Sequence, residues 1–353
     1  MIDQQELNCY YDFVLKLTIE SGKIIRDAIE GCKNIETKAG DWDLVTQFDK
    51  KVEEILIYSL AKEFPTHKFI AEETVSSTNH LPELTDDPTW IIDPIDGTTN
   101  FVHSFPFTCI SIGLAVKKEL EIGIVYNPVL EQLFTAKRGR GAYLNGKVIK
   151  SSSIEKLEHS LLCLEASYAT IENIRDITLG RVEAFVSVAH GIRTIGSAAL
   201  SLCYVAMGAA EGYHTDNLMP WDVAAGVLII RESGGVVIDT NGGEFNIMSP
   251  KVLAAGYLRK KLVKIKICKS CKLCLETLIC NKNTFSVTQL INVKTNGQLI
   301  RRNPRFLNLI LIRRTTFCNS LYRANRFLTV YKVLHYYGFI FPVRIMKLIY
   351  CST

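Results

Sequence analysis

The stretch 90–103 constrains the fold of this chain more than any other part of the sequence. It begins with an apolar, β-branched run, which predicts a buried strand ending at Asp93, after which Pro94 fixes the backbone direction. Asp96 follows three residues after Asp93, and Gly97 opens a turn into a short predicted helix. Carboxylates at this spacing can hold Mg²⁺, while the first N–H groups of the helix can bind a phosphate oxygen. The alternative is an Asx-rich turn after an ordinary strand.

Length and composition set broad limits on the chain. With 353 residues, of which 48% are hydrophobic, it can bury one large core or two modest ones. Residues 1–6 are polar and form no charged-then-apolar leader, and no stretch reaches the roughly 18 apolar residues needed to span a bilayer. We therefore expect a cytoplasmic protein with no membrane span.

Charge and cysteine are both unevenly distributed. All 36 acidic residues lie at or before Glu276, whereas twelve of the 41 Lys and Arg lie after it. Residues 1–276, which we call the body, are therefore mildly acidic, although the net charge of the whole chain is +5. An acidic body argues against nucleic-acid binding by that body. The eleven cysteines are odd in number, and five of them stand singly in apolar surroundings, which predicts reduced, buried thiols: Cys9, Cys32, Cys109, Cys163 and Cys203.

Two amphipathic helices are predicted near the start of the chain. Apolar residues recur at helical spacing over 6–30, and a second apolar stripe predicts a helix that opens at 41–43 and closes before Pro65. Asp49 borders the buried face of the second helix, where a carboxylate needs a partner. It is either a base or an acid beside a metal, or it forms an ordinary salt bridge at the rim.

The next region predicts a sheet rich in antiparallel pairs. Residues 68–71 form a predicted strand ending at the adjacent acids Glu72 and Glu73, and the polar run 76–88 is a predicted loop. Asn145-Gly146 is a hairpin signal, and three further strands precede it: 108–116, 121–126 and 132–136. Adjacent acids repel unless they share a cation, but on their own they are usually part of a solvated loop.

The second half alternates predicted strands and helices. Small residues after Gly196 permit either close backbone approach to a ligand or tight helix packing. Asp222 stands in the first turn of a helix that starts at Pro220, and is either an ordinary N-terminal acid or a third carboxylate directed at the first two. Strands are predicted at 161–164, 184–188 and 236–239, and the other helices at 171–179 and from 197 to about 208.

Together these segments resemble the inositol monophosphatase family of Mg²⁺-dependent, Li⁺-sensitive phosphatases. The stretch 90–103 and the sequence Trp-Asp-Val-Ala-Ala-Gly at 221–226, with Glu-Ser-Gly-Gly at 232–235, look like its two signature motifs. Blocks at 43–49, 72–73 and 191–199 match the family in order and at compatible spacing. The likeness covers roughly residues 6–256, and we assign 1–266 to a catalytic domain.

The resemblance implies an α/β (α+β) fold, a layered α-β-α-β-α sandwich, with a metal-dependent phosphatase site between its layers. It also implies two or three Mg²⁺ per site, which is physically sensible because clustered carboxylates cannot all ionise at close range without cations. The implied ligands are Glu72, Asp93 and the carbonyl of Ile95 for one Mg²⁺, and Asp93, Asp96 and Asp222 for a second.

Catalytic and substrate-binding roles are also carried over from the family by position. Thr98, with Asp49 behind it, would orient the attacking water, and Glu72 is the third residue with a catalytic assignment. No covalent nucleophile is required. The predicted substrate-binding residues are Glu72, Ile95, Asp96, Gly97, Thr98, Gly196, Ser197, Ala198, Thr215 and Asp222.

The chain departs from the family pattern at three places. Ala71 replaces the usual glycine before the acidic pair, and Thr215 stands where inositol-selective members carry a glutamate that contacts the sugar ring, which leaves the identity of the alcohol open. After about residue 258 the chain continues with a basic, aromatic run containing Cys268, Cys271, Cys274 and Cys280. These cysteines lack a second ligand pair at zinc-site spacing, so we expect 267–353 to be a poorly ordered extension or translated non-coding sequence. The alternative is a small metal site followed by a basic module.

The resemblance thus implies a Mg²⁺-dependent phosphomonoesterase for inositol monophosphate that forms a homodimer. A phosphatase for another sugar phosphate or a 3′-phosphonucleotide is the first alternative. A catalytically inactive binding protein is the second, although every carried-over carboxylate and Thr98 are present.

Overall fold

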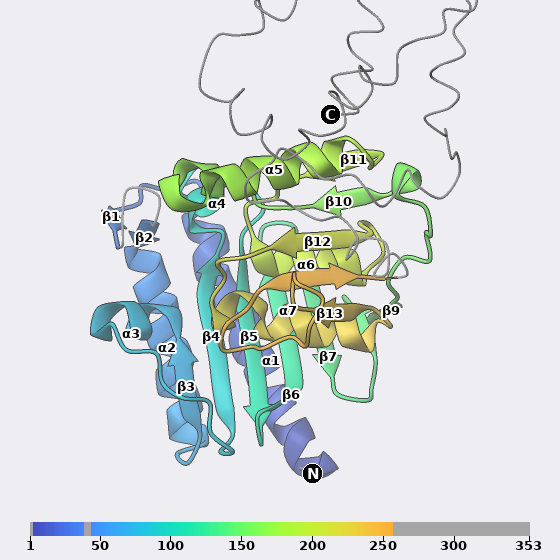
Figure 1. Cartoon of the computed structure of the whole chain (residues 1–353). Helices are drawn as coiled ribbons and strands as arrows, with labels where there is room; N and C mark the ends of the chain where they lie inside the picture. Colours follow the sequence, from blue (N-terminus) through green and yellow to red (C-terminus); the bar gives the residue numbers. More distant parts are fainter. Residues whose placement is uncertain (1–2, 39–43, 257–353) are drawn as a thin grey trace, which may run out of the picture. The chain divides into compact units, whose positions relative to one another are not determined.

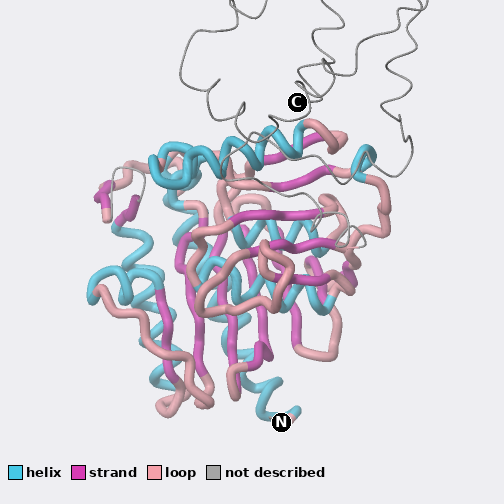
Figure 2. Tube along the Cα trace, viewed as in Figure 1, coloured by secondary structure: helices cyan, strands magenta, loops and turns pink. Residues whose placement is uncertain are grey.

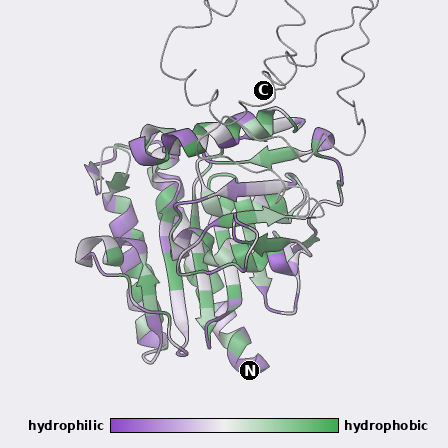
Figure 3. Ribbon diagram, viewed as in Figure 1, coloured by the Kyte–Doolittle hydropathy of each residue, from purple (hydrophilic) through white to green (hydrophobic). Residues whose placement is uncertain are grey.

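The computed structural model describes residues 3–38 and 44–256, and its helices and strands form five layers (Figures 1 and 2). A seven-stranded sheet has α1 and α2 on one face and α6 and α7 on the other, a five-stranded sheet follows, and α5 covers its outer face. Buried side chains cluster between these layers, and the central strands are mostly hydrophobic (Figure 3). The predicted α-β-α-β-α sandwich is therefore confirmed, whereas the predictions for 257–353, including the cysteine cluster, lie outside the described residues.

The first layer contains the two predicted helices, but the second begins later than expected. α1 spans Gln4–Ala28 and α2 spans Gln47–Glu63. The predicted start at 41–43 is wrong, because Leu44–Thr46 form the strand β2, which pairs antiparallel with β1, Ile35–Thr37. Thr46 caps α2: its hydroxyl accepts from the N–H of Phe48 at 3.1 Å, and its own N–H donates to the Asp49 carboxylate at 2.8 Å. This reciprocal cap fixes the helix start more firmly than acids further upstream can.

The large sheet confirms the antiparallel-rich prediction. β3 and β4 are parallel, and every following pair is antiparallel. Asn145 and Gly146 both have positive φ at the predicted hairpin, as a type I′ turn requires. The helix α3, Glu72–Thr78, takes up the start of the predicted loop. In sheet order the strands are β3 Lys68–Ala71, β4 Thr89–Asp96, β5 Cys109–Val116, β6 Glu119–Asn127, β7 Gln132–Lys137, β8 Ala142–Leu144 and β9 Lys147–Ile149.

One strand predicted for the second half is wrong. Residues 184–188 were expected in a strand, but α5 runs through Arg175–Val186 and only then turns. Thr178, Arg181 and Phe185 recur at helical spacing and are buried, so packing on the small sheet overrides the apolar run. The remaining elements are α4 Thr98–Val102, α6 Ala198–Ala206, α7 Pro220–Glu232, β10 Leu161–Cys163, β11 Gly191–Arg193, β12 Gly212–Thr215, β13 Val236–Ile238, β14 Val252–Ala255 and 3₁₀ turns at Leu157–His159, Ser167–Thr170 and Glu172–Ile174.

Two further predictions concern thiols and membranes. Cys109, Cys163 and Cys203 are buried as predicted, but Cys9 and Cys32 are exposed, and all five are free thiols. Within 3–38 and 44–256, no helix combines the length and apolar character that crossing a bilayer demands.

Two glycines bring α7 into direct contact with the large sheet. A Cβ added at Gly113 would lie 2.7 Å from the Cβ of Ala224, and one added at Gly123 would lie 2.6 Å from the carbonyl oxygen of Ala225. A side chain at either glycine position would push the helix away from the sheet. The glycines therefore set the distance between the sheet and the helix that carries Asp222.

We predict that Gly123→Ala lowers the free energy of unfolding by about 1–3 kcal/mol, because the added methyl meets fixed backbone atoms of α7. Denaturant unfolding measures this. Gly243→Ala is the matched control, since a Cβ there meets nothing within 4 Å. Equal stability of the two variants would contradict the tight packing of α7.

Candidate active site

Three carboxylates from two distant segments meet between the large sheet and α7. Asp93 and Asp96 come from the end of β4 and Asp222 from the first turn of α7, and one oxygen of each lies within 4.8 Å of the others. Burial and the charges of neighbouring acids raise the pKa of Asp93 and of Asp222 well above the usual value. Burial also raises the pKa of Asp96, to about 6. Buried, mutually repelling oxygen ligands are the donor set that a hard divalent cation such as Mg²⁺ fits.

An irregularity in β4 lets both of its acids face the same layer. Asp93 pairs with Ser111 and Asp96 with Cys109, so three steps along β4 correspond to two along β5. In a regular strand, residues three apart point to opposite faces. Asp93 lies two residues after Ile91 and therefore on the same face of β4, and Ile91 belongs to the core cluster around α7. The register shift turns Asp96 toward that same face. The Asx-turn alternative is only partly correct: the Ile95 N–H donates to Asp93 at 3.0 Å, but both carboxylates also join the cluster.

The acidic pair after β3 lies beside this cluster and is not a solvated loop. Because β3 runs parallel to β4 with Ala71 opposite Ile92, Glu72 follows at the same sheet edge as Asp93. The side chains of Glu72 and Glu73 are 17% and 9% exposed, and the Lys38 ammonium lies 2.7 Å from a carboxylate oxygen of each. Burial and the charge of Glu72 raise the pKa of Glu73 to about 8.

Two positioning groups in this region were missed by the sequence analysis. The Glu53 carboxylate accepts the backbone N–H groups of Glu73 and Thr74, each at 2.7 Å, and so fixes the start of α3. The signal was a second acid in the α2 stripe, four residues after Asp49. Lys38, the other missed group, carries no local pattern that points to the acids it binds.

The Thr98 hydroxyl and the Asp49 carboxylate meet as predicted. Thr98 begins α4 after Gly97, whose φ of +86° favours glycine. The Oγ1 atom of Thr98 lies 3.3 Å from a carboxylate oxygen of Asp49 and 3.1 Å from the Ile95 carbonyl oxygen. Asp49 is fully buried, so the rim salt bridge is wrong. Burial raises its pKa to about 6, although hydrogen bonds from Thr46 oppose the rise. A hydroxyl held against a carboxylate beside a cation site can orient a water molecule.

The segment 196–198 is attached to the carboxylate cluster. The Ser197 hydroxyl donates to Asp96 at 2.5 Å, and the Ala199 N–H donates to the same oxygen at 2.8 Å. α6 also packs tightly, since the side chain of Leu202 fills the space where Gly226 has no Cβ. Tight helix packing is therefore confirmed for this small-residue segment, and close approach to a ligand stays a prediction.

The loop before α7 contains the remaining predicted substrate residue. Thr215 is fully buried at the end of β12, and its hydroxyl donates to the Asp216 carbonyl oxygen at 3.1 Å. Asp222 accepts the Met219 N–H at 2.6 Å, which ties the loop to the cluster. The substrate-binding roles of Thr215 and of 196–198 stay predictions.

Comparisons with known proteins agree with this architecture. A sequence model described as the inositol monophosphatase family matches residues 6–272. Inositol monophosphatase 3 of Solanum lycopersicum is 43% identical over 257 residues, which is 72% of this chain and 95% of that protein. Inositol monophosphatase 1 of Homo sapiens is 44% identical over 245 residues, covering 69% and 88%.

Solved structures show the same arrangement. The IMPase of Thermotoga maritima has a TM-score of 0.66 and 34% identity, covering 72% of this chain and 95% of that one. The inositol-monophosphate-bound SaIMPase-II has a TM-score of 0.62 and 27% identity, covering 73% and 94%. Since the family model spans most of the sequence and the relatives are more than 40% identical over most of their length, this chain is a phosphatase and belongs to the inositol monophosphatase family.

Proposed function

We propose that this chain hydrolyses inositol monophosphate to inositol and phosphate, using water as the nucleophile. The cluster of Asp93, Asp96 and Asp222 is the observation that carries the proposal, because such a site can bind cations and a phosphate together. The identity of the relatives and the ligand bound in SaIMPase-II support the choice of substrate.

The acids would divide between two cations in the order that the family resemblance implies. Glu72, Asp93 and the Ile95 carbonyl would hold one Mg²⁺, and Asp93 would share the second with Asp96 and Asp222. Mg²⁺ at these positions supplies a lowered pKa for water and neutralises charge on the phosphoryl oxygens. The backbone already orients each acid of the cluster, because each accepts a backbone N–H on one oxygen.

The chain's own groups would direct the water and the phosphate. Thr98 would accept a hydrogen bond from the water while its own hydroxyl proton is donated to Asp49, a geometry supported by the 3.3 Å contact between Thr98 and Asp49. The N–H groups of Gly97 and Thr98 would bind the phosphate. The resemblance also implies two or three Mg²⁺, inhibition by Li⁺, a homodimer and a cytoplasmic location, and all four stay predictions.

A different phosphomonoester is the second candidate. Thr215 in place of the sugar-binding glutamate favours it, and SaIMPase-II has also been solved with 2′AMP bound. We expect the full chain to release phosphate from inositol 1-phosphate with Mg²⁺ and not after chelation. A panel with other sugar phosphates and 3′-phosphonucleotides ranks the alternatives by kcat/KM. Lack of release from every ester, by folded protein supplied with Mg²⁺, would remove the phosphatase assignment.

Asp93→Asn is expected to abolish turnover, with a loss of about a thousandfold or more, because it removes a charge that both cations share. The same change should raise the unfolding temperature of the metal-free protein, since it relieves repulsion within the cluster. Mg²⁺ should then give a smaller rise in unfolding temperature than it gives the unaltered chain. Asp86→Asn, at an exposed acid before β4, is the control and should change none of these quantities. Retained activity in Asp93→Asn would take Asp93 out of its bridging role.

Thr98→Val is expected to lower kcat about 10²–10⁴-fold with little change in the Mg²⁺ concentration needed for activity, because it deletes the hydroxyl while keeping the shape. Thr98→Ser retains the hydroxyl and should keep most of the activity. If valine and serine lower kcat equally, the hydroxyl does not orient the water.

A further inference from the structure

The loop between β12 and α7, residues 216–219, offers few side chains to a substrate. Thr215 before it is fully buried, and Leu218 inserts into the core. Asn217 and Met219 are the loop residues classed as exposed, and Asn217 has a positive φ of +62°. We call residues 216–219 the substrate loop, because the loop leads into α7 and its last residue, Met219, is hydrogen-bonded to the carboxylate of Asp222.

An arginine from a different layer holds the first residue of this loop. Arg181, in the middle of α5, donates from Nη2 to one carboxylate oxygen of Asp216. The Thr240 hydroxyl, from the turn after β13, donates to the other oxygen at 2.8 Å. Each oxygen of the Asp216 carboxylate therefore accepts a hydrogen bond, from groups that lie 35 and 24 residues away in the sequence.

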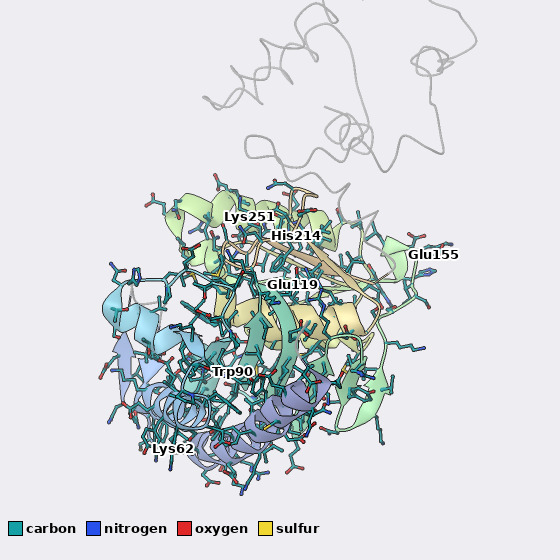
Figure 4. All side chains as sticks on the ribbon, turned by 90° about the horizontal axis from the view of Figure 1, so that it is seen from below. Lys62, Trp90, Glu119, Glu155, His214 and Lys251 are labelled. Carbon is teal, nitrogen blue, oxygen red and sulfur yellow. The ribbon has the colours of Figure 1, made fainter. Side chains whose placement is uncertain are left out.

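The arginine lies in a poor environment for a charge. Its side chain is only 4% exposed, and its Nε has no hydrogen-bond partner among the described residues. The neighbouring His214 packs edge-on against Phe185. Burial, and to a smaller extent the positive charge of Arg181, lowers the pKa of His214 to about 3. Figure 4 shows His214 with the small sheet, well apart from Trp90 of β4 in the large sheet.

A buried ion pair of this kind contributes geometric specificity more readily than stability. Its geometric effect here falls on the substrate loop, whose other end is fixed by the 2.6 Å hydrogen bond from the Met219 N–H to Asp222. Both ends are thus held, one by α5 and one by the metal-binding carboxylate. Because this hydrogen bond joins the loop to the cluster, an ester whose phosphate is held at the cluster would have the loop among its neighbours.

We propose that Arg181 is a positioning residue that determines substrate preference: through Asp216 it fixes the substrate loop beside the alcohol of the substrate. This inference rests on the proposed phosphatase function. Because Thr215 has no exposed surface, alcohol recognition depends on how the rest of the loop is held. Arg181 acts on KM for large alcohols and leaves the chemical step unchanged.

The test compares two esters and one double variant of the full chain. Arg181→Met/Asp216→Asn removes both charges, so neither is left buried without its partner and the fold is expected to persist. Inositol 1-phosphate carries a ring that reaches the loop, whereas glycerol 2-phosphate has a small, flexible alcohol. Arg175→Met, an exposed arginine in the same helix, is the matched control.

We expect the double variant to raise KM for inositol 1-phosphate about fivefold or more, to change KM for glycerol 2-phosphate by less than about twofold, and to leave both kcat values within about twofold. The control should match the unaltered chain. An unchanged ratio of the two KM values, or an equal change for both esters, would overturn the inference and leave the ion pair a structural contact. Absence of turnover of inositol 1-phosphate by the unaltered chain would instead refute the proposed function, and this inference with it.

Discussion

The repulsion between three clustered carboxylates, two of them buried and the third half-buried, is the constraint on which the rest of this structure depends. One carboxylate oxygen of each of Asp93, Asp96 and Asp222 lies within 4.8 Å of the others, where burial and the charges of neighbouring acids disfavour the charged forms of Asp93 and Asp222. Two features of the backbone impose this proximity: the register shift in β4, and the glycines at 113 and 123, which let α7 lie close against β5 and β6. A protein that concentrates charge in this way gains stability when a divalent cation binds, which couples folding to the chemistry of the site.

The site is also held in place from outside. Backbone N–H groups of Ile95, Ala199 and Met219 each fix one acid of the cluster, Glu53 fixes the start of α3, and Lys38 ion-pairs with the acids beside it. These contacts come from α2, the large sheet and α6, and from two segments outside the helices and strands. Preorganised ligands of this kind lower the cost of ordering the site when a cation and a phosphate bind.

Local patterns predicted much of this architecture, and tertiary packing decided the rest. The period-2 strands, the Asn145-Gly146 turn and the acids of the 90–103 stretch were all evident in the sequence, because each depends on neighbouring residues. The start of α2 and the extent of α5 were wrong, because a reciprocal cap and contacts with a distant sheet outweigh local signals. No local pattern indicates the burial of Thr215 or the ion pair between Arg181 and Asp216, because both depend on segments that are far apart in the sequence.

The most direct test of the central claim is anomalous diffraction at the manganese edge from crystals of this chain grown with Mn²⁺, a hard divalent cation that prefers the same oxygen ligands as Mg²⁺. The account predicts an anomalous peak among the carboxylate oxygens of Asp93, Asp96 and Asp222, and loss of that peak in Asp93→Asn crystals. Well-ordered carboxylates with no peak between them, at Mn²⁺ concentrations that support turnover, would contradict it.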